Sequence, residues 1–303
     1  LGLYLMLGGK APFDAQALAD WYADLHEGVS SGPQRQRLDG HLQRLRPLLA
    51  EAQPVALDSV LIDKVRAQLA SQPLAQRLYD RLLAHLATDP LPAFSIVSGA
   101  GSEGLLWFTR RSGEAPTAGV PGVFSPAGYQ LLHHKLEPFV IAELAREHRL
   151  MGLATALETG PVRDEVLARY HRGYIDSWQS FFDDLQVAGL EHAQDLPRHF
   201  QQLARPDSPF LALLRAASRQ TTLDYPEDAA GWMSLAQRQG LRLAGLGQGD
   251  VADSPGLHPV TEYFQALHQW AAAPEGGPAP SQPLQGALKD AGQFIQASQQ
   301  ALM

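Results

Sequence analysis

Two overlapping motifs near residue 100 contain residue types that could do chemistry. Gly99, Gly101 and Gly104 have the G-x-G-x-x-G spacing with which a dinucleotide-binding turn approaches a pyrophosphate. Ser102 lies in Ala-Gly-Ser-Glu-Gly, close to the strand-to-helix turn that presents a hydrolase nucleophile. Both sites need a doubly wound sheet, whereas the runs on either side of these glycines are short, apolar and strand-like. We therefore expect a β-hairpin with strands at 94–97 and 105–109, and no cofactor.

A stretch of histidines and carboxylates has the residue types of metal ligands. It contains His133, His134, Glu137, Glu143, Glu147 and His148. Ligands three or four residues apart would share a helix face, but the stretch lacks the H-E-x-x-H and E-x-x-H pairs of zinc and di-iron carboxylate sites. We expect a solvated polar face and no metal.

Asp183 and Asp184 are adjacent carboxylates that could act as a pair. Neighbouring residues on a helix point about 100° apart, so these two do not readily share a proton. We expect a surface or helix-end role for them. No residue is assigned as catalytic.

Apolar residues spaced three and four apart dominate the chain and predict a mainly α fold. The expected helices cover residues 13–25, 38–49, 57–69, 74–86, 162–185, 229–243, 259–272 and 284–302. Two more begin at Ser125-Pro126 and Ser208-Pro209, where serine is the N-cap and proline the first helical residue. The fold class is a multi-helix bundle with one small β-hairpin insertion.

Aromatic residues are concentrated on one side of the helix expected at 162–185. They are Tyr170, Tyr174, Trp178, Phe181 and Phe182. Such a ladder is more often helix–helix core than a ligand-binding box, so it predicts a large helix contact.

The segment 119–129 is rich in glycine and proline, and we call it the elbow. We expect it to be a rigid, packed loop between the hairpin and the next helix. Its glycines would allow a turn with positive φ or a close backbone approach, and its aromatic residues would anchor it. The residues assigned to this structural elbow are Gly119, Pro121, Gly122, Phe124, Ser125, Pro126, Gly128 and Tyr129.

Composition limits the possible partners and chemistry. The chain has 303 residues, no Cys and a net charge of −8. These values exclude disulfides and thiolate chemistry, and they argue against nucleic acid as the main partner. No apolar run approaches the ~20 residues that span a membrane. We expect three parts: an N-terminal helical subdomain at 1–90, the hairpin, elbow and central helices at 91–225, and C-terminal helices with a Gly/Pro-rich linker at 226–303.

Five segments in order carry a family resemblance. They are residues 4–8, 13–21, 119–129, 170–185 and 208–214, and the most distinctive is G-V-P-G-V-F-S-P-A-G-Y at 119–129. Together they resemble the periplasmic region of the TssM/IcmF family, the inner-membrane scaffold of type VI secretion systems. The resemblance covers most of residues 1–225 and thins beyond.

The resemblance implies a structural, non-enzymatic segment on the periplasmic face of the bacterial inner membrane. Its parent would be membrane-anchored, with the outer-membrane lipoprotein TssJ, inner-membrane TssL and further copies of itself as partners. The family's β-rich, lipoprotein-docking domain would be missing here or begin after residue 303. Within the chain, we expect 94–110 and 284–302 to make contacts. The alternatives are a serine hydrolase using Ser102 and a cytosolic helical adaptor.

Overall fold

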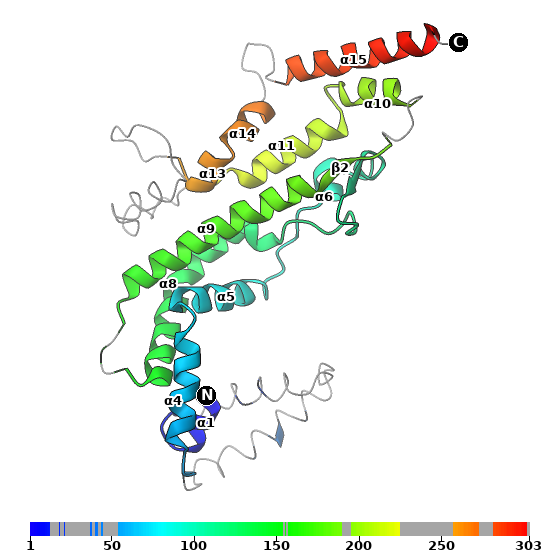
Figure 1. Ribbon diagram of the computed structural model, residues 1–303. Coiled ribbons are helices and arrows are strands. Elements are labelled where there is room, and N and C mark those ends of the chain that lie inside the picture. The colour runs from blue at the N-terminus through cyan, green and yellow to red at the C-terminus, as the bar shows by residue number, and fades with distance from the viewer. Residues whose placement is uncertain are drawn as a thin grey trace. The chain divides into compact units, whose positions relative to one another are not determined.

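A computed structural model describes residues 1–12, 54–153, 157–189, 195–224, 257–272 and 281–301, with isolated positions at 18, 21, 37, 40, 41, 44 and 155. The regular elements of this part of the chain are helices, apart from one pair of short strands (Figure 1). The mainly α fold class is therefore confirmed. The helices expected at 13–25, 38–49 and 229–243 lie outside the described residues.

The elements follow one another in this order: α1 (Gly2–Leu7), α4 (Ser59–Ala70), α5 (Leu74–Leu86), α6 (Ile96–Ala100), α7 (Gly104–Trp107), β1 (Phe108–Arg110), the 3-10 turn η1 (Gly122–Phe124), α8 (Pro126–Met151), α9 (Thr159–Asp184), β2 (Leu185–Val187), α10 (Leu196–Leu203), α11 (Pro209–Thr221), α13 (Pro259–Tyr263), α14 (Gln265–Ala271) and α15 (Gln282–Ala301). Within the described ranges, no helix combines the length and hydropathy needed to cross a membrane.

The chain forms two compact units. Unit 1 comprises Leu1–Arg77 and Val140–Thr159, and unit 2 comprises Leu78–Phe139 and Gly160–Met303. The three-part division expected from the sequence stays a prediction, because residues around its second boundary are not described.

Unit 1 is held together by a few specific contacts. The backbone N–H of Asp58 donates to the Tyr4 hydroxyl at 2.9 Å, while the Asp58 carboxylate caps α4 by accepting from the N–H of Val60 at 2.9 Å. Arg66 donates to the Leu150 carbonyl at 2.9 Å, which ties α4 to the end of α8. Leu5, on α1, is 1% exposed.

A buried ion pair joins the two segments of unit 1. Arg77 Nη2 and Glu147 Oε2 are 2.7 Å apart, with 9% and 2% of their side chains exposed. Arg77 also donates to the carbonyls of Leu69 and Gln72, at 2.5 Å and 2.7 Å, and so closes the end of α4. The solvated face expected at 133–148 is therefore wrong for Glu147, because a partner 70 residues away removes it from water.

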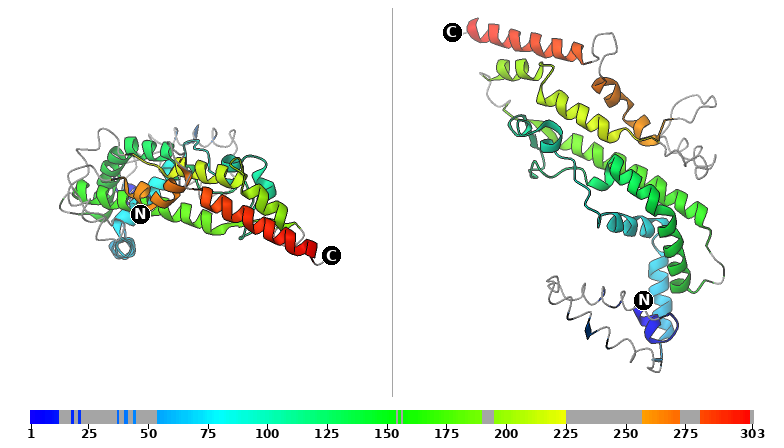
Figure 2. Two further views of the ribbon diagram at one scale, coloured as in Figure 1. Left: turned by 90° about the horizontal axis from the view of Figure 1, so that it is seen from above. Right: turned by 180° about the vertical axis from the view of Figure 1, so that it is seen from behind.

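Helix α9 is the axis of unit 2. It lies between the first part of α8 and α11, as Figure 1 and the right-hand view of Figure 2 show. Its aromatic ladder is almost fully buried, with Tyr170, Tyr174 and Trp178 at 0% exposure and Phe181 at 2%. The Tyr174 hydroxyl donates to the Gln220 carbonyl at the end of α11. The ladder is core, as expected.

The expected helix starts are confirmed. The Ser208 hydroxyl accepts from the N–H of Leu211 at 3.3 Å at the start of α11. The Ser125 hydroxyl accepts from the N–H of Gly128 at 3.1 Å at the start of α8. In each case serine satisfies a backbone donor that the first helical turn leaves open.

The hairpin expected at 94–110 is wrong in its placement, although the described residues do form one small antiparallel sheet. Ser95 and Ser98 form a reciprocal capping box that begins α6, so residues 96–100 are helical rather than extended. Strand β1 then pairs with β2, with Thr109 opposite Gln186, and not with residues 94–97. Phe94 makes an isolated antiparallel bridge to Val120.

The C-terminal helix α15 packs on α10. A Cβ atom on Gly292 would lie 3.2 Å from the Phe200 Cβ and 3.2 Å from the Pro197 carbonyl, so glycine is what permits the close approach of the two helices. Figure 1 shows them side by side, in red and yellow-green. Phe294, on the same helix, is 74% exposed.

We predict that Glu147→Leu destabilises unit 1 by about 3 kcal/mol or more, because it leaves the Arg77 guanidinium buried without its carboxylate. Denaturant unfolding with a probe in unit 1 measures this change. The double variant Arg77→Met, Glu147→Leu should recover part of the loss. Asp207→Asn is the control, since its pair with Arg205 is exposed to solvent and the variant should change stability far less than Glu147→Leu does. Equal effects of Glu147→Leu and Asp207→Asn would contradict the prediction.

Candidate functional site: the elbow and its seat on α9

The elbow contains a buried turn whose carbonyls are all bonded to side chains. In η1, the Gly122 carbonyl accepts from the Ser125 hydroxyl at 2.6 Å, the Val123 carbonyl from the Tyr170 hydroxyl at 2.5 Å, and the Phe124 carbonyl from Trp178 Nε1 at 3.0 Å. A short 3-10 turn cannot satisfy these acceptors within itself, and leaving a buried carbonyl unbonded is costly. The aromatic ladder of α9 therefore supplies hydrogen bonds as well as apolar surface.

Ring contacts accompany these hydrogen bonds. The Phe124 ring is 5.6 Å from that of Tyr170 and 5.9 Å from that of Tyr174. The Phe94 ring lies 4.7 Å from that of Trp178. Phe124 is 6% exposed and Tyr129 is 3% exposed. The anchoring roles expected for Phe124 and Tyr129 are thus present in the structure.

The elbow requires glycine because carbonyl oxygens lie close to these backbone positions, and not because of unusual φ angles. A Cβ on Gly119 would lie 1.9 Å from the Phe94 carbonyl oxygen, one on Gly122 would lie 2.4 Å from the Leu91 oxygen, and one on Gly128 would lie 2.3 Å from the Val123 oxygen. The positive φ expected at Gly119 or Gly122 is wrong, since neither has it. Pro121 lies between the two, and its carbonyl accepts from the N–H of Phe124 at 2.9 Å.

A charged clamp holds the loop that precedes the elbow. Asp184, the last residue of α9, accepts from Arg110 Nε at 2.5 Å and from the backbone N–H and hydroxyl of Ser112 at 2.6 Å and 2.7 Å. The hydrogen bonds from Ser112 and Arg110 lower the pKa of Asp184 to about 2. Arg110 also donates to the Ala118 carbonyl at 3.0 Å. The helix-end role expected for Asp184 is confirmed.

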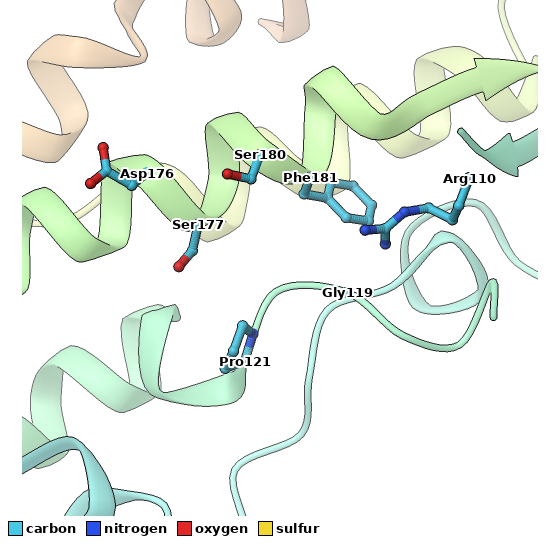
Figure 3. A pocket seen from close by; sticks show the side chains of 7 residues that line it. All are labelled: Arg110, Gly119, Pro121, Asp176, Ser177, Ser180 and Phe181. Atoms are coloured by element: carbon cyan, nitrogen blue, oxygen red, sulfur yellow. The ribbon is translucent and has the colours of Figure 1, made fainter. Parts of the chain in front are cut away.

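A shallow pocket of about 290 Å³ opens between the elbow and α9. Figure 3 shows the Arg110 guanidinium beside the Phe181 ring, 5.1 Å from its centroid, and the Ser177 side chain directed toward Pro121. The residues that line the pocket are Arg110, Gly119, Pro121, Asp176, Ser177, Ser180 and Phe181. This lining offers two serine hydroxyls but no histidine that could deprotonate them.

The other candidates from the sequence are not brought together. Ser102 lies exposed in the turn between α6 and α7, and its carbonyl accepts from the N–H of Leu105 at 3.2 Å. A nucleophile turn follows a strand, whereas α6 precedes this one. Among the described residues, no group of three or more His, Asp or Glu side chains is arranged to hold a metal ion.

Sequence reasoning missed two features of this site. It did not foresee that Tyr170 and Trp178 donate to the elbow, although both carry a donor that needs a partner when buried. It also did not single out His171, which is 1% exposed on α9. The aromatic periodicity placed all three residues on one helix, but their partners lie about 50 residues or more away and leave no local pattern.

Comparison with known proteins defines the class to which the chain belongs. The profile of the family described as "IcmF-related: Intracellular multiplication and human macrophage-killing" matches residues 1–222, which include the elbow and α9. The chain therefore belongs to the IcmF-related family, and the resemblance recognised from its five segments is confirmed.

A curated relative connects the chain to type VI secretion. The chain is 30% identical over 311 aligned residues to the type VI secretion system component TssM1 of Pseudomonas aeruginosa. The alignment covers 96% of this chain and 28% of that relative, so the chain spans little more than a quarter of the relative's length. No solved structure matches.

We predict that Tyr170→Phe lowers the free energy of unfolding of unit 2 by about 1–3 kcal/mol, because it leaves the buried Val123 carbonyl without its donor. Chemical denaturation followed by circular dichroism measures the change. Tyr263→Phe is the matched control, since Tyr263 is 42% exposed and its variant should stay within about 0.5 kcal/mol of the wild type. If the two variants lose the same stability, the hydroxyl of Tyr170 is not supporting the elbow.

We also predict that Gly119→Ala breaks the Phe94–Val120 bridge, because its new methyl group would overlap the Phe94 carbonyl. The elbow segment should lose amide protection in hydrogen exchange, and the protein should be destabilised by more than about 2 kcal/mol. Gly286→Ala is the control: its Cβ meets nothing within 4 Å, and a helical alanine should be neutral or stabilising by up to about 1 kcal/mol. If the Gly119→Ala protein is as stable as the Gly286→Ala protein, the close approach of residue 119 to the Phe94 carbonyl does not require glycine.

Proposed function

We propose that this chain is a non-catalytic structural segment of a type VI secretion membrane complex, located on the periplasmic face of the bacterial inner membrane. The observation that supports it most is the 30% identity to TssM1 along nearly the whole chain. The geometry agrees with a supporting role, because the polar atoms of the α9 ladder are used to fix the elbow. Such a segment acts through contacts with other proteins.

The proposed partners are the other subunits of the complex, with TssJ and TssL as the candidates, and further copies of the chain. Exposed apolar residues lie on the elements for which contacts were expected, and two of them stand out. Leu106 on α7 is 73% exposed and Phe294 on α15 is 74% exposed. A large exposed apolar side chain is a reasonable position at which to search for a protein contact.

Site-specific photo-crosslinking tests this partner proposal. A photoreactive phenylalanine analogue is placed at Leu106 or Phe294 in the parent protein, in cells that assemble the secretion system. We expect adducts with other complex subunits from at least one position and none from a control analogue at the exposed position Glu165 on α9. The absence of subunit adducts from both apolar positions would reject α7 and α15 as contact elements.

Protease access tests the location. Protease added to spheroplasts should cleave this region of the parent protein while the inner membrane is intact. Cleavage only after the inner membrane is lysed would support the alternative of a cytosolic helical adaptor.

The enzyme alternative has its own test. A fluorophosphonate probe should not label the chain, because Ser102 lies between two helices and not after a strand. Labelling that is abolished by Ser102→Ala would overturn the non-catalytic proposal.

A further inference from the structure

The pocket between the elbow and α9 has groups of opposite charge at its two ends. Figure 3 shows Arg110 at one end and Asp176 at the other. Ser177 and Ser180 lie between them along α9, and the Phe181 ring adds apolar surface. The volume of about 290 Å³ is near the lower end of the range for ligand pockets. A small volume therefore offers donors, acceptors and an apolar wall to a ligand.

The Arg110 end of the pocket offers hydrogen-bond donors whose charge is already balanced. Arg110 Nε donates to Asp184 at 2.5 Å, and Nη2 donates to Glu114 at 3.2 Å. Nη1 donates to the Ala118 carbonyl at 3.0 Å. A guanidinium has more N–H groups than these bonds use, so donors remain for a ligand in the pocket. Because two carboxylates lie beside it, Arg110 favours a neutral carbonyl oxygen over a further anion.

The opposite end presents a carboxylate without a counter-ion. The Asp176 side chain is exposed, and its carboxylate forms no hydrogen bond or ion pair with a described residue. Arg172, one helical turn earlier on α9, makes no ion pair with it. Burial, followed by the charges of Asp80 and Asp176, raises the pKa of Tyr79 to about 12, so the charge of Asp176 acts on neighbouring groups. This end favours a cationic ligand group.

Polar groups without partners also line the middle of the pocket. Within the described part of the chain, the hydroxyls of Ser177 and Ser180 form no hydrogen bond, and neither do the N–H and carbonyl of Gly119. Val120, the next residue, uses its N–H and carbonyl on Phe94, at 2.8 Å and 2.9 Å. Gly119 thus offers a main-chain donor and acceptor, and each serine can donate or accept. Such groups match the N–H and carbonyl groups of a peptide.

The length of the pocket suits a short extended segment. Phe181, which lies beside Arg110, follows Asp176 by five residues, or about 7.5 Å along a helix. An extended chain covers that distance with about two or three residues, at roughly 3.3 Å per residue. A carbonyl at one end of such a segment and a cationic side chain at the other can reach both ends of the pocket.

We propose that this pocket binds an extended peptide segment of a partner protein, with a main-chain carbonyl on Arg110 and a lysine side chain on Asp176. The ammonium group of lysine carries N–H donors that the Asp176 carboxylate and a serine hydroxyl accept. The peptide N–H and carbonyl groups between the two ends bond to Gly119 and the serines. A free amine would satisfy Asp176 alone, so the peptide main chain is part of the recognition.

Titration of the isotope-labelled full chain with the peptide acetyl-Gly-Lys-Gly-amide, followed by amide NMR, tests the proposal. We expect saturable shift changes at Gly119, Ser177 and Ser180, with an affinity in the millimolar range. The same peptide with norleucine in place of lysine lacks the charge and should bind about fivefold to tenfold more weakly. Butylammonium, which lacks peptide carbonyls, should be weaker by a similar factor. Equal affinity of either control, or shift changes away from the pocket, would overturn the proposal.

An exposed variant assigns the lysine to Asp176. Asp176→Asn keeps the size of the side chain, and it should weaken binding of the lysine peptide about fivefold to tenfold. Its affinity for the norleucine peptide should stay as in the wild type. Asp183→Asn is the matched control, because Asp183 is exposed on the same helix and does not line the pocket. If Asp176→Asn binds the lysine peptide as tightly as Asp183→Asn does, Asp176 does not receive the lysine.

The inference rests on the proposed function only in taking the bound segment to belong to another protein of the complex. The titration uses this chain alone. Failure of peptide binding would therefore leave the crosslinking and protease tests of the proposed function unaffected.

Discussion

The structure of unit 2 depends on the burial of three consecutive carbonyls in η1. The carbonyls of Gly122, Val123 and Phe124 can leave water only because Ser125, Tyr170 and Trp178 supply donors. Tyr170, Tyr174 and Trp178 are spaced by four, so one face of α9 presents them in line. The separation of Tyr170 and Trp178 along this face fixes the register of α9 against the elbow. The approach of the elbow to Phe94 and Leu91 then requires glycine at 119 and 122.

Structural features that depend only on residues close together in the sequence could be predicted. Ser125-Pro126 and Ser208-Pro209 mark helix starts because a cap and the first helical residue lie side by side in the chain. The burial of the aromatic ladder of α9 could be predicted because its aromatic residues recur at helical spacing. The prediction of a hairpin at 94–110 was wrong for two reasons. Ser95 and Ser98 close a capping box that outweighs the β-branched residues between them, and the partner of β1 is a strand about 75 residues later in the chain.

The elbow could be recognised from composition, but the physical role of Gly119 and Gly122 could not. Those two were expected to provide turns and Gly128 a close backbone approach, whereas all three avoid an overlap with a carbonyl oxygen. In two of the three cases that oxygen belongs to residues 91–94. Glu147 and His171 show the same limit for polar residues. Both belong to helices rich in polar residues, and only the fold shows that each is buried, one beside Arg77 and the other beside His258.

The distance along the chain between the elbow and its donors has a consequence for biosynthesis. The Phe124 carbonyl precedes Trp178, its donor, by 54 residues. During synthesis the elbow leaves the ribosome first, and Trp178 follows roughly 3 to 10 seconds later at ordinary elongation rates. During this interval the apolar side chains of Phe94, Val123 and Phe124 cannot yet pack against α9. The nascent chain thus exposes an apolar segment that chaperones can bind for a limited time. The exposure ends when α9 emerges and covers the segment.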